Sequence, residues 1–248
     1  MSKNRNKEKD LQWLYGKHAV KAALKNPARE IHRFVLLKSS VEFQKECGAT
    51  GEIVDEKFFA TLFGRESVHQ GCAVYVKRLR EHCLEEMVED DSDMRPIMFL
   101  DQVTDPQNLG SILRSAAVFG ARAVVTTEDR GPGLTAAVAK AASGALEAVP
   151  LIRVVNLVQS IKFLRKHGFW SIGLEEKSAK TLEEVSLNDK FILVVGGEGS
   201  GLRRLTRESC DFLAKLPSWS VFGTLNAAQA ATVALYESLR QRCLANNR

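Results

Sequence analysis

The sequence predicts an α/β protein with two domains, and three observations support this class. Short apolar runs rich in β-branched residues alternate with helix-like stretches along most of the 248 residues. This length is at the upper edge for a single hydrophobic core. An acidic segment, residues 80–95, separates two basic regions. We therefore expect a basic tail at 1–10, a first domain at 11–79, a linker at 80–95 and a second domain at 96–248.

The first domain is predicted to be a small α/β unit. A helix-like stretch at Gly16–Lys25 leads to a strand at Ile31–Leu37, a second helix-like stretch and a strand at Glu52–Val54. A helix at Glu56–Phe63 and a strand at Cys72–Val76 follow. This alternation predicts a mixed or parallel sheet with helices on its faces.

The second domain repeats the alternation with longer elements. Its predicted strands are Ile97–Leu100, Ala123–Thr126, Pro150–Val154, Phe169–Gly173, Phe191–Val195 and Phe212–Leu216. Its predicted helices are Leu109–Phe119, Leu134–Ser143, Leu157–His167 and a long Ala-rich helix at about 226–243. Nearly continuous apolar strands are typical of an open parallel sheet that is covered on both faces.

Composition excludes several classes of protein. With 45% hydrophobic and 26% charged residues and only six prolines, the chain is neither collagen-like nor disordered. No apolar stretch is long enough to span a membrane, and Met1–Asp10 lacks the apolar core of a signal peptide. The five cysteines are odd in number and contain no C-x-x-C pair. We expect a reduced cytoplasmic protein with no disulfide framework and no metal.

The net charge of +5 is distributed unevenly. Residues 1–79 carry 15 Lys/Arg against nine Asp/Glu, residues 80–95 two against seven, and residues 96–248 18 against 14. Because Lys and Arg neutralise phosphates, two basic domains favour a nucleic-acid partner. The acidic run Glu81–Asp93, with Pro96 after it, predicts a solvated linker or an exposed helix.

Three loops that follow predicted strands carry the chemistry, since ligands of open α/β sheets bind at the carboxyl ends of strands. In the first loop, Asp105-Pro106 predicts a turn and Asn108 lies near a helix start. Arg114 lies six residues further on, so the Asn108 and Arg114 side chains should point in different directions. A helix cap and a surface arginine are the ordinary interpretation. The small and apolar neighbours of Arg114 favour anion binding instead.

The second loop is the glycine-rich segment Gly196–Gly201. Its backbone N–H groups can approach a ligand closely. It matches neither G-x-G-x-x-G nor a phosphate-binding P-loop. Glu198 would repel a phosphate, so the loop suits a neutral or cationic ligand or hydroxyl donors.

The third loop runs from Leu216 to Asn226. Thr224 and Asn226 place a hydroxyl and an amide at a helix start, where capping is the ordinary interpretation. The Ala-rich segment Ala227–Ala231 permits close approach of another backbone, or it reflects helix propensity alone.

Together the three loops resemble the motifs of the SpoU (TrmH-like) family of SPOUT RNA methyltransferases. The resemblance covers residues 97–242, through Asp101–Arg114, Gly196–Arg207 and Leu225-Asn226 with the Ala-rich helix. Residues 13–77 also resemble the ribosomal-protein-like substrate-binding domain of the 23S rRNA guanosine-2′-O-methyltransferase branch. The segments that carry this second resemblance are Tyr15–Val20 and His69–Gly71.

The resemblance implies methyl transfer from S-adenosylmethionine to a ribose 2′-oxygen of RNA, either 23S rRNA or tRNA, by a homodimer packed around a C-terminal trefoil knot. The implied catalytic positions are Asn108, Arg114, Glu198, Thr224 and Asn226. The implied cofactor contacts are Gly196, Gly197, Gly201, Leu216 and Leu225. Candidates for RNA contact, each equally interpretable as an ordinary surface group, are Lys17, Arg33, His69, Gln70, Lys77 and Arg78.

The role of Arg114 has two interpretations. The family assigns its equivalent as the base that deprotonates the ribose hydroxyl. A guanidinium keeps its proton in almost any protein setting, so we favour a clamp on the target phosphate and the forming alkoxide. Asn108 would then orient the hydroxyl, and Glu198 would hold the loop or a donor of the substrate.

The sequence departs from the family pattern in two motifs. Gly197 stands where alanine is usual and Thr224 where serine is usual. The third motif is further altered at Ser218, Trp219, Phe222, Ala228 and Gln229. A member that has lost catalysis and serves as an RNA-binding or ribosome-assembly protein is therefore the alternative. The retained polar residues favour the enzyme, and loop order together with Glu198 excludes a nucleotide-binding oxidoreductase.

Overall fold

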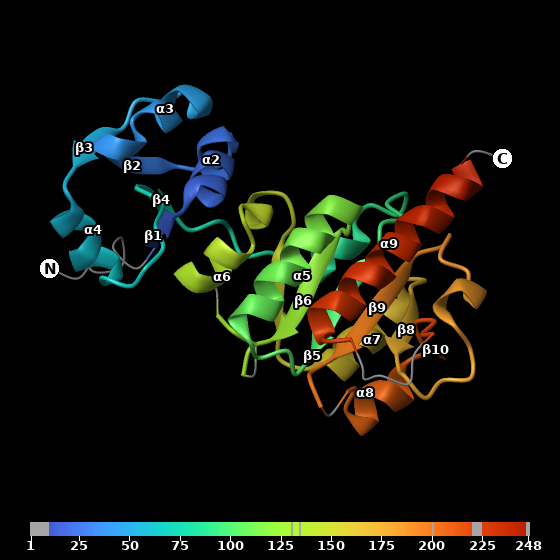
Figure 1. Cartoon of the computed structure of the whole chain (residues 1–248). Coiled ribbons are helices and arrows are strands. Elements are labelled where there is room, and N and C mark those ends of the chain that lie inside the picture. Colours follow the sequence, from blue (N-terminus) through green and yellow to red (C-terminus); the bar gives the residue numbers. More distant parts are fainter. Residues whose placement is uncertain (1–9, 130, 134, 200, 220–224, 247–248) are drawn as a thin grey trace, which may run out of the picture. The chain divides into compact units, whose positions relative to one another are not determined.

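The computed structural model describes residues 10–129, 131–133, 135–199, 201–219 and 225–246. These residues form two compact units (Figure 1). The first unit contains the described parts of Met1–Arg80 and Leu134–Ala148, and the second those of Glu81–Gly133 and Val149–Arg248. Both units are α/β, which confirms the predicted fold class.

The first unit is built on a mixed four-stranded sheet. Its strands, in spatial order, are β1 (Leu11–Tyr15), β4 (Cys72–Lys77), β2 (Ile31–Leu37) and β3 (Glu52–Val54). The β1–β4 and β4–β2 pairs are antiparallel, whereas β2–β3 is parallel. Strand β1 was not predicted. Only Leu14 of its five residues is buried, so the strand depends on pairing with β4 rather than on its own pattern.

Helices cover both faces of this sheet. The face toward α2 (Lys17–Lys25) and α3 (Glu42–Cys47) buries Val20, Phe34, Leu36, Phe43 and Val74. The opposite face packs Val35, Leu37 and Ala73 against Phe59 of α4 (Glu56–Phe63). A short 3-10 turn, η1 (Lys38–Ser40), follows β2.

Residues 135–148 pack within the first unit, although they follow a strand of the second along the chain. They form α6 (Ala136–Ala141), shorter than the predicted helix, and η3 (Ala145–Glu147). Ala139 lies in the core of the first unit, and Glu147 forms a buried, two-pronged ion pair with Arg29. The segment is therefore held by both apolar contact and charge.

The second unit contains a six-stranded sheet in which every pair is parallel, as predicted. In spatial order its strands are β10 (Phe212–Ala214), β8 (Trp170–Leu174), β9 (Phe191–Gly196), β5 (Ile97–Asp101), β6 (Ala123–Thr127) and β7 (Leu151–Val154). Because β9 returns between β8 and β5, the loops after β5 and β9 emerge side by side.

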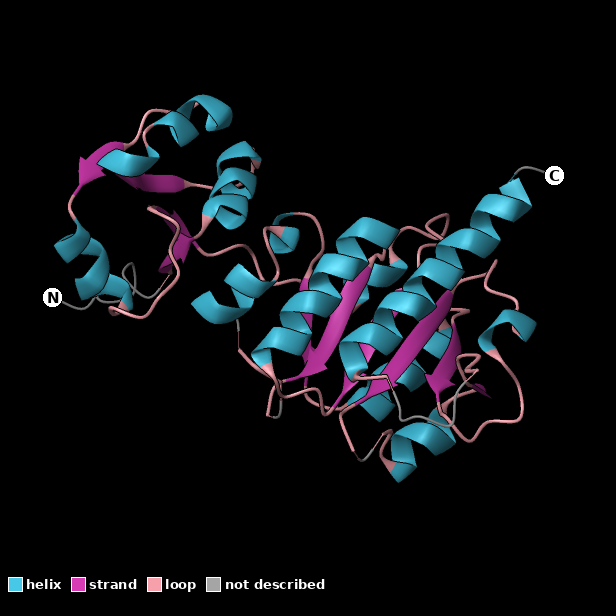
Figure 2. Cartoon of the chain, in the orientation of Figure 1, coloured by secondary structure: helices cyan, strands magenta, loops and turns pink. Residues whose placement is uncertain are grey.

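Two helix layers enclose this sheet (Figure 2). Helices α5 (Pro106–Phe119) and α9 (Ala227–Asn246) pack against each other on one face, where Ser115 and Thr232 share a hydrogen bond of 2.6 Å. On the other face, α7 (Leu157–Lys166) joins a core that includes Phe99 and Val194. The remaining elements are α8 (Arg204–Ser209), η2 (Glu85–Val88) and η4 (Leu182–Glu184).

The acidic segment 80–95 is not fully solvated, contrary to expectation. Leu84 and Met87 are buried in the core of the second unit, three residues apart around η2. Arg122, itself buried, forms an ion pair with Asp93 and donates to two carbonyl groups of the segment. Most of the acidic residues are exposed, while two apolar side chains and the Asp93–Arg122 ion pair anchor the segment. None of the described helices is long and apolar enough to cross a membrane.

Candidate active site

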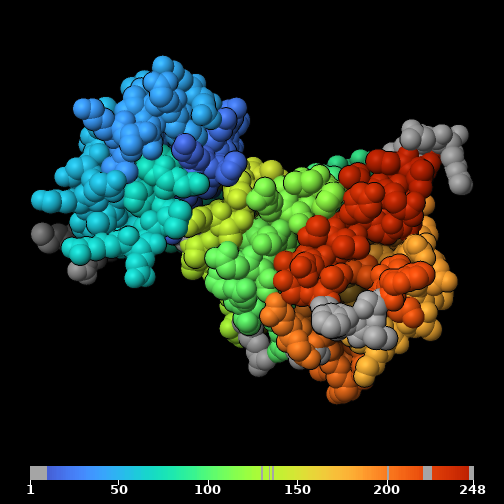
Figure 3. Space-filling view, in the orientation of Figure 1, coloured from blue at the N-terminus to red at the C-terminus, as the bar shows by residue number. Residues whose placement is uncertain are grey.

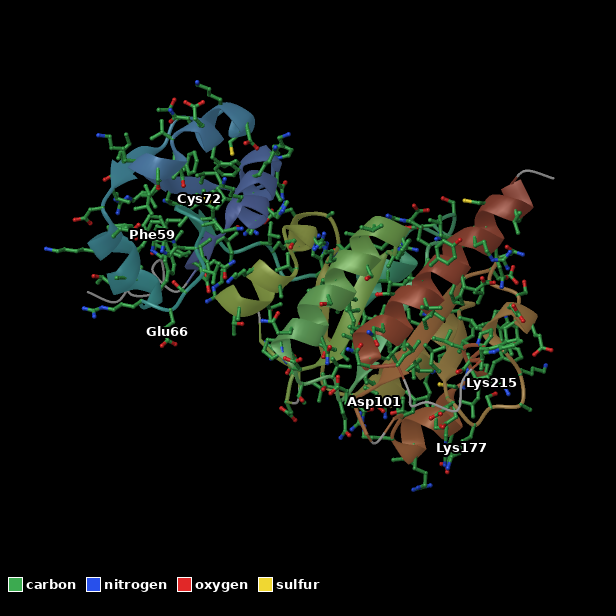
Figure 4. The ribbon with its side chains drawn as sticks, in the orientation of Figure 1. Phe59, Glu66, Cys72, Asp101, Lys177 and Lys215 are labelled. Atoms are coloured by element: carbon green, nitrogen blue, oxygen red, sulfur yellow. The ribbon has the colours of Figure 1, made fainter. Side chains whose placement is uncertain are left out.

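The candidate site lies at the carboxyl edge of the second sheet, where β5 and β9 end. Asp101 is the last residue of β5 and is paired in register with Gly196, the last residue of β9. Figure 4 shows Asp101 at this edge of the sheet. The two predicted loops that follow these strands therefore begin next to each other.

Helix α5 carries two predicted site residues, Asn108 and Arg114, which point in different directions. The helix begins at Pro106 and is capped by Asp105, whose carboxylate accepts from the Gln107 N–H at 3.0 Å. Asn108 is thus inside the first turn and is not the cap. Asn108 is 9% exposed, whereas Arg114 is exposed, so the two side chains point in different directions as expected.

The glycine-rich loop is fixed by close backbone crossings. A Cβ atom on Gly196 would lie 2.1 Å from the carbonyl carbon of Gly201, and one on Gly197 would lie 2.3 Å from the Gln102 carbonyl oxygen. The Gly201 N–H also donates to the Gly197 carbonyl at 3.1 Å. No side chain fits at Gly196 or Gly197 without moving backbone, so the loop shape depends on both glycines.

A hydrogen bond joins the first two motifs. The Asn108 Nδ2 donates to Glu198 Oε1 at 2.8 Å, across 90 residues of sequence. Asn108 is buried and Glu198 is exposed, so the amide orients a carboxylate that faces solvent. The structure therefore brings together two of the five predicted catalytic residues.

Asp101 and Arg203 are the part of the site that sequence reasoning missed. The Asp101 carboxylate is fully buried and accepts from the Arg203 backbone N–H at 2.9 Å and from its Nε at 2.6 Å. A charged residue at the end of an otherwise apolar strand was the available signal, because a buried carboxylate needs a cationic partner.

The third motif is described only in part. Thr224 lies outside the described residues, as do residues 220–223. Asn226 is exposed and caps α9: its Oδ1 accepts from the Gln229 N–H at 2.8 Å, and the Gln229 side chain accepts from the Asn226 N–H at 3.3 Å. Leu216 is partly buried, and Leu225 is 51% exposed.

This arrangement can position and polarise a hydroxyl group. It presents the exposed Glu198 carboxylate, which accepts a hydrogen bond from the Asn108 amide. It also presents the exposed Arg114 guanidinium, which has no ion-pair or hydrogen-bond partner among the described residues. Within the same residues, no group of three or more potential metal-ligating side chains forms.

Comparison with known families decides the class of the chain. Residues 95–236 match the model of the SpoU rRNA methylase family. The chain belongs to this family. Residues 13–82 match a second model, described as RNA 2′-O ribose methyltransferase substrate binding.

Curated relatives extend over nearly the whole chain. The chain is 38% identical over 242 residues to the 23S rRNA (guanosine-2′-O-)-methyltransferase RlmB of Pseudomonas aeruginosa, covering 93% of this chain and 98% of the relative. It is 37% identical to the protein of the same name from Xylella fastidiosa, with 94% and 98% covered. Among solved structures, the SpoU methyltransferase AviRb from Streptomyces viridochromogenes matches with a TM-score of 0.79 and 19% identity, covering 98% of this chain and 93% of AviRb.

The six candidate RNA residues fall at two ends of the first sheet. Lys17, His69 and Gln70 lie where β1 ends and β4 begins, and the Gln70 side chain accepts from the Lys17 N–H at 2.9 Å. His69 stacks on Phe59 with ring centroids 4.3 Å apart. The other three, Arg33, Lys77 and Arg78, lie toward the opposite strand ends.

Proposed function

We propose that this SpoU-family chain is an S-adenosylmethionine-dependent RNA methyltransferase that modifies a ribose 2′-oxygen, most specifically a guanosine of 23S rRNA. The observation that carries the proposal is the Asn108–Glu198 hydrogen bond, which assembles the family's first two motifs at one sheet edge. Relatives that this chain matches over 98% of their length carry the name 23S rRNA (guanosine-2′-O-)-methyltransferase, which supports the substrate. All five cysteines are free, which supports the proposed cytoplasmic location.

The loop after β9 fits the proposed cofactor. Space beyond Gly199 and Gly201 is open, since a Cβ atom on either glycine would meet nothing within 4 Å. The exposed Glu198 carboxylate would favour a cationic ligand rather than a phosphate. S-adenosylmethionine supplies a methyl carbon activated by a sulfonium. The proposed binding residues are Gly196, Gly197, Gly201, Leu216 and Leu225, which would act mainly through backbone groups.

The protein's own side chains would position and activate the ribose hydroxyl. Asn108 orients Glu198, and these two hold the loop and the hydroxyl. Arg114 is exposed and without a partner among the described residues, so it can bind the target phosphate and stabilise the forming alkoxide. Asn226 uses its Oδ1 as a helix cap, which leaves its amide N–H groups to donate to substrate. Thr224, which lies outside the described residues, is the remaining proposed catalytic residue.

A homodimer through the second unit is part of the proposal. The outer surface of α5 and α9 carries exposed apolar residues: Val118 (67%), Val233 (42%) and Tyr236 (52%). Figure 3 shows both helices, green and red, at the surface of this unit. A second copy that covered this face would bury these side chains and would lie beside Arg114, one helical turn from Val118. The trefoil knot implied by the family resemblance stays a prediction.

Methyl transfer to a 23S rRNA transcript tests the proposal. Labelled S-adenosylmethionine and purified protein should methylate one guanosine 2′-oxygen, located by mapping of 2′-O-methyl groups. Asn108→Ala should lower the rate by about 10²-fold, as expected when a positioning hydrogen bond is lost, whereas the matched cap variant Asn156→Ala should not.

Other outcomes would replace the proposal. Methylation of tRNA alone would move the substrate to that class. RNA binding with no calorimetric heat from S-adenosylmethionine up to millimolar concentration would indicate the non-catalytic alternative. A pH–rate profile of Arg114→Lys separates the two roles of that residue. Collapse at every pH supports the clamp, and a near-normal rate with a displaced profile supports the base.

A further inference from the structure

We infer that Asp101 and Arg203 form a positioning pair that sets the geometry of the glycine-rich loop and, through it, of Glu198. The inference rests on the proposed methyl transfer and adds to it two residues to which no role is assigned. Neither residue is placed in contact with the reacting atoms. Both act by holding the loop that carries Glu198.

The entry to the loop is fixed by the Asp101 backbone. The Gly197 N–H donates to the Asp101 carbonyl at 2.7 Å. Immediately after Asp101, Gln102 has φ 63°, in the left-handed region that non-glycine residues rarely occupy. This conformation brings the Gln102 carbonyl so close to Gly197 that only glycine fits there. This backbone conformation costs free energy for a non-glycine residue, so the surrounding structure must hold Gln102 in it.

The exit from the loop is fixed by the side chain of the same residue. The Asp101 Oδ2 accepts from the Arg203 backbone N–H at 2.9 Å, and its Oδ1 accepts from the Arg203 Nε at 2.6 Å. The carboxylate is fully buried while the Arg203 side chain is 39% exposed. One residue therefore ties both ends of the loop to the end of β5.

Glu198 lies inside the segment tied in this way. It follows Gly197 directly, and its carboxylate accepts from Asn108 on the neighbouring helix. If the loop ends moved by about 1 Å, the Glu198 carboxylate would leave its position beside the hydroxyl, and misplacement of this size can cost about 10²-fold in rate. The pair is thus expected to influence kcat without contacting substrate.

The carboxylate is the group that this geometry requires. Its two oxygens accept from two different donors of Arg203. An asparagine at position 101 has the same shape but only one acceptor oxygen, so its NH₂ group would face one of the two N–H donors. Asp101→Asn should therefore release one end of the loop while leaving the strand intact.

A double-mutant cycle tests the inference. Asp101→Asn should lower kcat for the 23S rRNA transcript about 10- to 100-fold. In a Glu198→Gln background the same change should lower kcat by less than about 3-fold, because residues that act as a unit are not additive. Asp93→Asn is the matched control. It removes a similar carboxylate from an ion pair with Arg122, which precedes β6 at the amino edge of the sheet, and it should leave kcat unchanged.

A second measurement keeps the test independent of activity. Hydrogen exchange of peptides covering residues 196–203 should be faster in Asp101→Asn than in the wild type or in Asp93→Asn. Equal loop exchange, an unchanged kcat, or the same fold-loss in both Glu198 backgrounds would each overturn the inference. Should Asp101→Asn not fold, Arg203→Met removes the side-chain donor but keeps the backbone N–H, and it should show the same effects at smaller size. A wild-type protein with no methyl transfer would instead overturn the proposed function, and loop exchange would still test the pair.

Discussion

Substitution of Gly196 by alanine is the most direct test of how the loop is built. The added Cβ would lie 2.1 Å from the Gly201 carbonyl carbon, 2.3 Å from its oxygen and 2.4 Å from the Leu202 nitrogen. All three atoms belong to backbone and cannot rotate away, so the crossing must open. Overpacking of this kind costs about 1–3 kcal/mol. For a chain of this length, about 2 kcal/mol corresponds to a fall in Tm of about 4–8 °C.

The expected functional result is the loss of cofactor binding in a protein that remains folded. Titration calorimetry with S-adenosylmethionine should give at least a tenfold weaker Kd for Gly196→Ala, and a thermal melt should give the predicted fall in Tm. Gly133→Ala is the control, because a Cβ atom there meets nothing within 4 Å and its φ is not positive. Wild-type affinity together with a wild-type Tm in Gly196→Ala would show that the backbone crossing is not the feature that shapes this loop.

Three further predictions concern stability and reactivity. Glu147→Ala leaves the Arg29 guanidinium buried without its counter-charge and should lower the free energy of unfolding by about 3 kcal/mol, measured by urea denaturation. A hydrogen bond from Arg240 lowers the pKa of the Glu237 carboxyl in the folded protein. The ionised carboxylate therefore stabilises the fold fully above the pKa of the unfolded chain, and this stabilisation is lost as the pH falls through the lower pKa of the folded protein. The Tm difference between wild type and Glu237→Gln should therefore shrink between pH 7 and pH 3. Burial raises the pKa of the Cys72 thiol to about 12, so mass spectrometry should find iodoacetamide on it at pH 8 only after unfolding.

Strands with a strong intrinsic pattern were predictable from sequence, and elements that depend on partners were not. The β9 segment is a continuous apolar run, and the β2 segment is apolar apart from His32 and Arg33; the structure places strands in both. Helix α8 was not predicted because its six residues, RLTRES, have no apolar period. Thr206 is its one buried residue. Arg203, which directly precedes the helix, is hydrogen-bonded to Asp101, so tertiary contacts determine this helix.

The candidate site was likewise predictable only in part. The resemblance of the three loops to the SpoU motifs implied a methyltransferase site, and an amide, a guanidinium and a carboxylate suit activation of a hydroxyl. Which of them meet was not predictable from spacing, since Asn108 and Glu198 are 90 residues apart and depend on β9 returning beside β5. The Asp101–Arg203 pair was missed for the same reason, as its two members lie 102 residues apart.

The altered third motif illustrates how a departure from a family pattern can preserve geometry. Relative to the family pattern, Ala228 loses a hydroxyl and Gln229 adds an amide. In the structure, that amide oxygen accepts from the Asn226 N–H while Asn226 accepts from the Gln229 N–H, which closes a reciprocal cap on α9. The cap fixes where the helix begins and therefore where Asn226 lies. Gln229→Ala should then loosen Asn226 rather than remove a substrate contact, so any loss of rate should be accompanied by fraying of the first turn of α9 in hydrogen exchange.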